Sequence, residues 1–190
     1  MTDSAVADQA DSDRPTRRAL LGAGVIGAAF AMAGSRSASA ATGGLSESDA
    51  ALVGFAISLE LTARDLYDAA MDAGATGQVW EVFREQHESY AQRLAGIAGT
   101  PANARNDVLF DELVGGFTGA TGAAAFDLEN TAAATHTELL GVVTDDKAAK
   151  AMASMIAIES RHATVLASFA KGGDFDAMFL NTATALSPEA

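Results

Sequence analysis

The sequence predicts an all-α protein, a four-helix bundle with a long crossover between its second and third helices. Alanine is abundant and runs of β-branched residues are scarce, which favours helix. Only Pro101 interrupts the chain between residues 16 and 187, so long helices are allowed. Four long segments repeat apolar residues with a helical period, and residues 99–119 separate the second from the third.

The composition indicates one folded, acidic domain. The chain has 190 residues, of which 49% are hydrophobic, enough for a single core and too many for a disordered chain. Its net charge of −13 argues against nucleic acid as a partner, because phosphate binding needs a basic surface. The chain has no cysteine, which excludes disulfides, thiolate chemistry and iron–sulfur clusters.

Residues 1–40 have the pattern of an export signal. The tripeptide Thr-Arg-Arg at 16–18 precedes an apolar run at 19–33, and Ala-Ser-Ala at 38–40 supplies a small-x-small cleavage pattern. The arginine pair resembles a twin-arginine signal, which implies the twin-arginine export machinery as a partner. We expect an exported protein in the periplasm, cell wall or extracellular space, with residues 41–190 as the mature bundle. The apolar run is short for a bilayer span, but an uncleaved signal would tether the protein to the membrane.

The first helix is expected at about residues 47–73. Ser46 can cap it, Asp49 can complete a capping box, and Gly74 can end it. Glu60 lies at the edge of its apolar stripe. The second helix is expected at about residues 78–98. Its apolar line has His87 in the middle.

The crossover follows at residues 99–119. The sequence DVLFDELVGG within it can add a short helix, since a structureless loop of this length is unusual in a compact domain. The third helix is expected at about residues 122–143. Glu129 and His136 lie on its buried line.

The fourth helix is expected at about residues 145–171, with Thr144 as its cap. Its buried line carries Glu159 and His162, one helical turn apart. The tail at 174–190 contains aromatic and aliphatic residues, and we expect part of it to pack on the bundle.

Three carboxylates and all three histidines therefore fall on or beside buried stripes. A buried carboxylate must be paired, protonated or bound to a metal ion. Carboxylates from three helices, together with imidazoles, can converge at the middle of a bundle, although a paired polar core explains any one of them. Carboxylate and imidazole donors suit iron(II), manganese or zinc better than calcium. The six residues are Glu60, His87, Glu129, His136, Glu159 and His162.

Three sequence pieces carry a family resemblance. LELTARDLY contains Glu60, LENTAAATH contains Glu129, and IESRH is an ExxH motif. Residues 45–171 resemble the ferritin-like superfamily, in particular small exported bacterial ferritin-like proteins. The resemblance implies a ferritin-like four-helix bundle that holds iron, as a di-iron or mono-iron site, or manganese. The metal ligands expected on this basis are Glu60, His87, Glu129, Glu159 and His162. Tyr67 and His136 would hydrogen-bond ligand carboxylates.

The second helix departs from the family pattern, which has another ExxH there. The sequence REQHESY allows two registers, one with Glu88 as the ligand and one with His87 followed by Tyr90. Helical periodicity favours His87, while Glu88 can pair with Arg84. One expected histidine is missing in either register. The site is expected to hold a single ion, a mixed pair of ions or no ion. Tyr90 is either a metal ligand or an ordinary core tyrosine.

Two functions follow from these expectations. The first is an exported metal-binding protein with O₂- or peroxide-dependent metal oxidation. The alternative is a cell-envelope binding or structural protein on a ferritin-like scaffold with a degenerate metal site. The broken motif of the second helix motivates this alternative. Enzymatic activity and a homodimer are left open.

Overall fold

The computed structural model describes residues 44–119 and 121–188 and is all-helical over these ranges. The all-α prediction is confirmed. The predicted export signal at residues 1–40 lies outside the described residues. Within the described part, no helix combines the length and the apolar character that a bilayer span requires. The helices are α1 (Glu47–Asp72), α2 (Gln78–Ala98), α3 (Asp107–Gly119), α4 (Thr121–Val142), α5 (Asp146–Ala170) and α6 (Phe175–Phe179).

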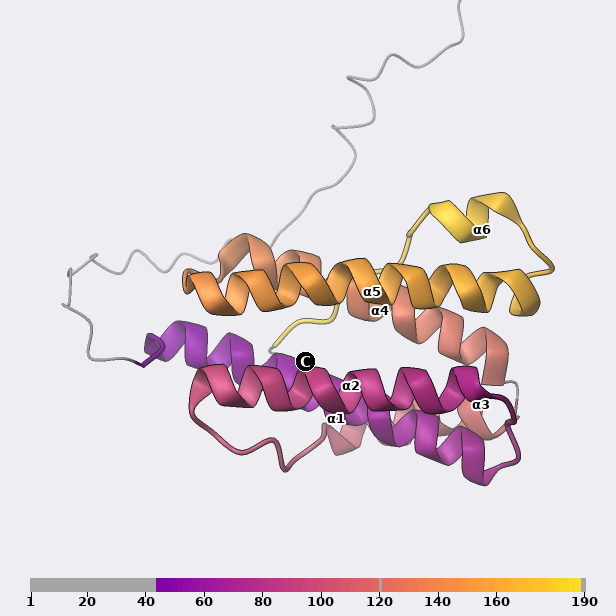
Figure 1. Ribbon diagram of the computed structural model, residues 1–190, viewed down its shortest axis with the longest axis horizontal. Helices are drawn as coiled ribbons and strands as arrows, with labels where there is room; N and C mark the ends of the chain where they lie inside the picture. The colour runs from indigo at the N-terminus through magenta and orange to yellow at the C-terminus, as the bar shows by residue number, and fades with distance from the viewer. Residues whose placement is uncertain (1–43, 120, 189–190) are drawn as a thin grey trace, which may run out of the picture. The chain divides into compact units, whose positions relative to one another are not determined.

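Four long helices form the bundle as two antiparallel pairs. α1 packs most closely on α2, and α4 on α5, each pair joined by a short loop (Figure 1). The crossover between α2 and α4 contains α3, which packs on both α1 and α4. The predicted short helix in the crossover therefore exists. α6 packs on α5, as expected for an apolar tail.

The ends of the helices confirm one predicted cap and correct two further expectations. Ser46 caps α1 by accepting the backbone N–H of Asp49 at 3.1 Å. The expected capping box does not form, because the carboxylate of Asp49 accepts instead from the N–H and hydroxyl of Thr144, at 2.9 and 2.7 Å. Thr144 is therefore not the cap of α5. Asp145 fills that position and accepts two backbone N–H groups of the first turn.

Two apolar clusters lie along the bundle, with a polar layer between them. One contains Val53 of α1 and Met155 of α5; the other contains Leu66 of α1 and Leu166 of α5. Glu60 lies between the two clusters along α1. The polar residues of this layer are therefore removed from water at both ends, so they must satisfy one another or a bound ion.

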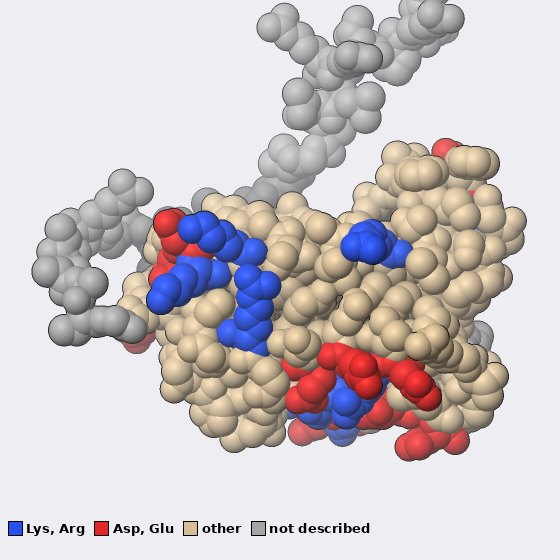
Figure 2. Space-filling model, viewed as in Figure 1, with Lys and Arg blue, Asp and Glu red and all other residues tan. Residues whose placement is uncertain are grey.

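Acidic side chains gather around basic ones over α1 and α2 on the face seen in Figure 2. Arg64 of α1 contacts Glu88 of α2 at 2.7 Å, and Arg84 of α2 contacts Asp68 of α1 at 3.1 Å. The expected pairing of Glu88 with Arg84 is corrected, since Arg64 reaches across from the neighbouring helix and is closer. These ion pairs connect the two helices at their solvent edge.

Candidate metal centre

Six ionisable side chains meet in the polar layer of the bundle. They come from all four long helices and include every histidine of the chain. Each is at most 4% exposed. The residues are Glu60 on α1, His87 on α2, Glu129 and His136 on α4, and Glu159 and His162 on α5.

The six side chains alternate between imidazole and carboxylate in one continuous row. At one end, Nδ1 of His162 lies 3.1 Å from Oε2 of Glu129. The other oxygen of Glu129 lies 3.1 Å from Nε2 of His87. Nδ1 of His87 in turn lies 2.7 Å from Oε2 of Glu60. Glu129 and Glu60 therefore hold the ring of His87 from opposite sides.

The row continues from Glu60 to the far helix pair. Oε1 of Glu60 lies 3.4 Å from Nε2 of His136, without a hydrogen bond. Nδ1 of His136 contacts both oxygens of Glu159, at 2.9 and 3.1 Å. Nε2 of His136 is the only buried side-chain nitrogen or oxygen without a hydrogen-bond partner among the residues that the structure describes. The row therefore has one open contact, between Glu60 and His136.

The six residues separate into two triads of possible metal ligands. One comprises His87, Glu129 and His162, and the other comprises Glu60, His136 and Glu159. Within each triad, one ligand atom from each residue lies within 4.8 Å of the others. Donors about 2.1 Å from a shared ion lie at most about 4.2 Å apart, so small side-chain movements suffice to bring each triad onto an ion.

Helix geometry explains why these residues meet. Glu159 and His162 are three residues apart and lie on one face of α5. Glu129 and His136 are seven residues apart, which is two turns along the same face of α4. α4 and α5 are closely packed neighbours, so their faces join the row directly.

Neighbouring side chains fix one half of the row. The hydroxyl of Tyr67 donates to Oε1 of Glu129 at 2.5 Å, and its ring stacks on His87 with 5.5 Å between ring centroids. Phe83 stacks on the ring of His162 at 3.8 Å. Such outer contacts hold potential ligands in position before an ion arrives.

Gln86 is a further contact that the sequence analysis missed. Its side-chain oxygen lies 2.6 Å from Nε2 of His162 and can accept a hydrogen bond from the N–H group at that position. Nδ1 of His162 then faces Glu129 and the interior of the first triad. The sequence carries no signal for this contact, because Gln86 is 76 positions from His162 and precedes the apolar position of its own helix.

The paired row shifts the pKa values of its members. Burial alone lowers the pKa of His87, but Glu129 and Glu60 outweigh burial and raise it well above its usual range. Burial likewise opposes the charge on His136, and Glu159 with Glu60 raises its pKa to about 9. In the metal-free protein near neutral pH, these shifts in pKa favour the imidazolium form of both rings.

The carboxylates respond according to their place in the row. Burial raises the pKa of Glu129, but His87 and His162 on either side outweigh it and lower the pKa to about 2. Glu159 ends the row with a single imidazole partner, so burial dominates and raises its pKa to about 7. Burial, with Glu60 and the other carboxylates nearby, raises the pKa of Tyr90 to about 12.

The structure brings all five predicted site residues into this one row. It also adds His136, which was expected to support a ligand carboxylate and does contact Glu159, but which is also a member of the second triad. Glu88 lies outside the row, paired with Arg64. Tyr90 is half-buried, with its ring edge-on to His87 at 6.5 Å between centroids. Of the two registers for α2, the one with His87 faces the centre.

Comparison with known proteins gives one match. A family model described as a ferritin-like domain matches residues 48–172, which cover α1 from its second residue, all of α2 to α5, and all six residues of the row. No curated protein and no solved structure matches the chain.

Proposed function

The chain belongs to the ferritin-like domain family, and on that premise we propose that it binds iron or manganese at the two triads of its buried row. The observation that carries the proposal is the unpartnered Nε2 of His136, 3.4 Å from Oε1 of Glu60. An ion held by the second triad would give this nitrogen the partner it lacks. The residues present therefore fit a metal.

The donor types limit the class of metal. The first triad offers two imidazoles and one carboxylate, and the second offers one imidazole and two carboxylates. Neither offers sulfur, and such nitrogen and oxygen sets suit iron and manganese. Glu60 contacts His87 of the first triad with one oxygen and His136 of the second with the other. Glu60 is therefore the carboxylate that connects the two triads.

The unequal triads support a pair of ions that differ in affinity. The triad with two imidazoles would hold the later first-row metals more tightly, whereas the triad with two carboxylates tolerates manganese. Bound iron would supply one-electron chemistry toward O₂ or peroxide. The protein's own part is to exclude water, to hold Glu129 through Tyr67, and to present Nδ1 of His162 through Gln86.

Metal analysis of the purified chain tests the proposal. The apoprotein is loaded anaerobically with iron(II) or manganese(II), desalted, and analysed for metal per chain. Two ions per chain are expected, one for each triad. Metal that stays far below one ion per chain for both elements would refute the proposal.

Export through the twin-arginine route is part of the same proposal and rests on residues 1–40 of the sequence. A reporter fused after residue 40 is expected to leave the cytoplasm, and the double substitution R17K and R18K is expected to retain it. Unchanged export of the double variant would remove the twin-arginine assignment. Cleavage after the Ala-Ser-Ala sequence is read from the N-terminus of the exported product.

A second function is a cell-envelope binding or structural role without metal. The observation that favours it is the alternation of three imidazoles with three carboxylates, in which His87 and His136 form ion pairs with Glu60, Glu129 and Glu159. The two functions differ in the metal-dependent change of the melting temperature. A metal-binding centre raises the melting temperature when metal is added, and the rise disappears in the double variant E159A and H162A. A purely structural row shows no such rise in either protein.

A further inference from the structure

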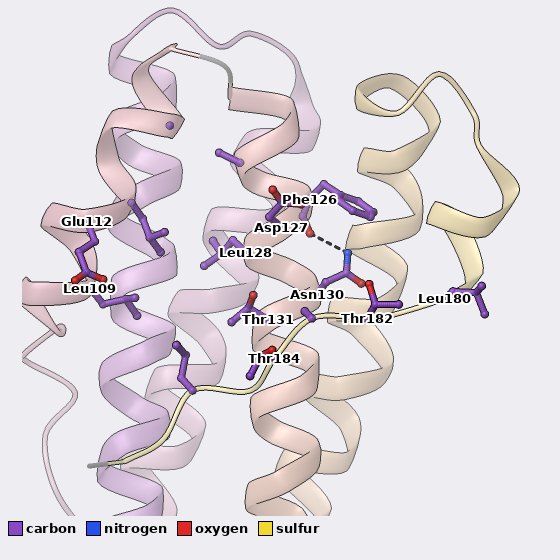
Figure 3. Close-up of a pocket in the computed structure, with 15 residues that line it drawn as sticks. Leu109, Glu112, Phe126, Asp127, Leu128, Asn130, Thr131, Leu180, Thr182 and Thr184 are labelled. Atoms are coloured by element: carbon purple, nitrogen blue, oxygen red, sulfur yellow. Dashed lines mark hydrogen bonds between the residues drawn. The ribbon is translucent and has the colours of Figure 1, made fainter. Parts of the chain in front are cut away.

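Two cavities lie in line beside the row. The outer cavity, of about 680 Å³, opens between α3, α4 and the tail that follows α6. Figure 3 shows its lining, with Leu109 and Glu112 on α3, Asn130 and Thr131 on α4, and Leu180 and Thr184 on the tail. The inner cavity, of about 20 Å³, is lined by Glu60 and His87. The inner cavity therefore ends at two members of the row.

The same four residues line both cavities, and we call them the partition. Three are aliphatic and one carries a hydroxyl: Leu109 of α3, Leu128 and Thr131 of α4, and Leu186 of the tail. Leu109 and Leu128 are fixed on helices. Leu186 is the part of the partition that lies outside any helix.

Two hydrogen bonds to α4 hold the tail between residues 181 and 186. The backbone N–H of Leu186 donates to Oγ1 of Thr135 at 2.9 Å, and the side-chain amide of Asn181 donates to the carbonyl of Asn130 at 2.8 Å. Between these two points the tail has no helix. A segment held by isolated hydrogen bonds opens at a much lower free energy than a packed helix. Leu186 can therefore move while the rest of the partition stays in place.

The size and chemistry of the passage select what can pass. A cavity of 10–15 Å³ is about the minimum for one water, so the inner cavity takes one molecule of about that size. A divalent ion with its water shell is several times larger. The three leucines of the partition also offer a cation no ligand. Small uncharged molecules meet neither obstacle.

We propose that Leu186, in the tail that follows α6, gates an access route by which dioxygen or hydrogen peroxide reaches the Glu60–His87 side of the row. The role of this route in oxidation rests on the proposed metal function. The route itself is a property of the metal-free protein. Metal ions do not use it, so metal content is expected to be independent of Leu186.

The first test uses dissolved dioxygen as a paramagnetic probe of the metal-free protein. Under oxygen pressure, NMR signals of His87 and of the Leu59 and Ala132 methyl groups, which line the inner cavity and not the outer one, are expected to relax faster. L186W should reduce this enhancement several-fold, and L186A should increase it. The matched control is L180W, a substitution in the same tail at a residue that lines only the outer cavity. Equal enhancement at the inner cavity in all four proteins would overturn the proposal.

The second test uses the protein loaded with iron(II) and mixed with hydrogen peroxide. L186W is expected to slow oxidation several-fold at unchanged metal content, while L180W leaves the rate unchanged. A rate that is the same in L186W and L180W would overturn the gate. If none of the proteins holds metal, the metal proposal fails by itself, and the dioxygen experiment still decides the route. Melting curves establish that each variant is folded.

Discussion

Nε2 of His136 lies 3.4 Å from Oε1 of Glu60 and forms no hydrogen bond with it. Both side chains are almost completely buried. A buried polar atom without a partner costs about 1–3 kcal/mol. The row therefore has a physical reason to accept an ion at this point, and ion binding by the second triad should depend on His136.

Replacing His136 should separate the two triads. H136L is expected to lose the ion of the second triad and to keep the ion held by His87, Glu129 and His162. Elemental analysis would then give about half of the wild-type metal content. The matched control is Y90F, because Tyr90 is half-buried and belongs to neither triad. Equal metal content in H136L and the wild type would contradict the assignment of the second triad.

Adjacent residues on α2 provide a sharp comparison. H87A is expected to abolish binding at the first triad, because His87 contacts both Glu60 and Glu129. E88A should leave metal content unchanged and cost at most about 1 kcal/mol, since it removes a partly exposed ion pair with Arg64. Isothermal titration with manganese(II) measures the metal affinity of both variants. A larger loss of metal affinity in E88A than in H87A would show that Glu88, and not His87, is the ligand on α2.

Tyr67 should stabilise the fold through Glu129. Y67F removes the hydroxyl that donates to Oε1 of Glu129 at 2.5 Å and leaves the ring packing in place. A buried hydrogen bond to a charged group contributes about 1.5–3 kcal/mol, so the free energy of unfolding should fall by about that amount. Urea denaturation measures the change, with Y90F as the tyrosine control. Loss of less than about 0.5 kcal/mol would show that Glu129 finds another donor.

The stability of the metal-free protein should fall with rising pH. Although burial opposes it, Glu159 and Glu60 raise the pKa of His136 to about 9, against about 6.5 in an unfolded chain. Between these values the folded state keeps a proton that the unfolded state has lost, so its stability decreases through this interval. Metal needs the neutral imidazole, so the metal-induced rise in melting temperature should grow over the same interval. A pH series of melting curves with and without manganese(II) tests both slopes, and H136L should flatten them.

Asp49 should connect the two helix pairs. Its carboxylate, only 2% exposed, accepts two hydrogen bonds from Thr144 in the loop between α4 and α5. D49A removes both of these hydrogen bonds, and because hydrogen bonds to a charged group contribute about 1.5–3 kcal/mol at most, an exposed partner such as Thr144 makes the expected cost about 1–2 kcal/mol. E47A in the same first turn of α1 is the control, because Glu47 is exposed. Thermal denaturation compares them, and similar melting temperatures would contradict the role of Asp49.

Helical periodicity is the reason that the four long helices and the site residues could be predicted from the sequence. The spacing of apolar residues indicated four long helices, and the same spacing put Glu60, His87, Glu129, Glu159 and His162 on inward-facing lines. Periodicity also favoured His87 over Glu88, since adjacent residues on a helix point about 100° apart. These features depend on one helix at a time, so a single sequence contains them.

Features that depend on two elements at once were missed. Thr144 and Asp145 are both good cap residues, and the choice between them follows from the position of Asp49 at the start of another helix. Gln86 reaches His162 only because α2 and α5 are neighbours. The partition at Leu186 similarly needs the path of the tail across α4.

The alternating row has a practical consequence for spectroscopy. Because His87 and His136 form ion pairs with Glu60, Glu129 and Glu159, the interior is largely neutralised without a metal ion. The empty bundle should therefore stay folded and act as a host for metal substitution. Cobalt(II), whose visible absorption responds to its ligands, could be placed in each triad in turn and used to report on His87 and His136 separately.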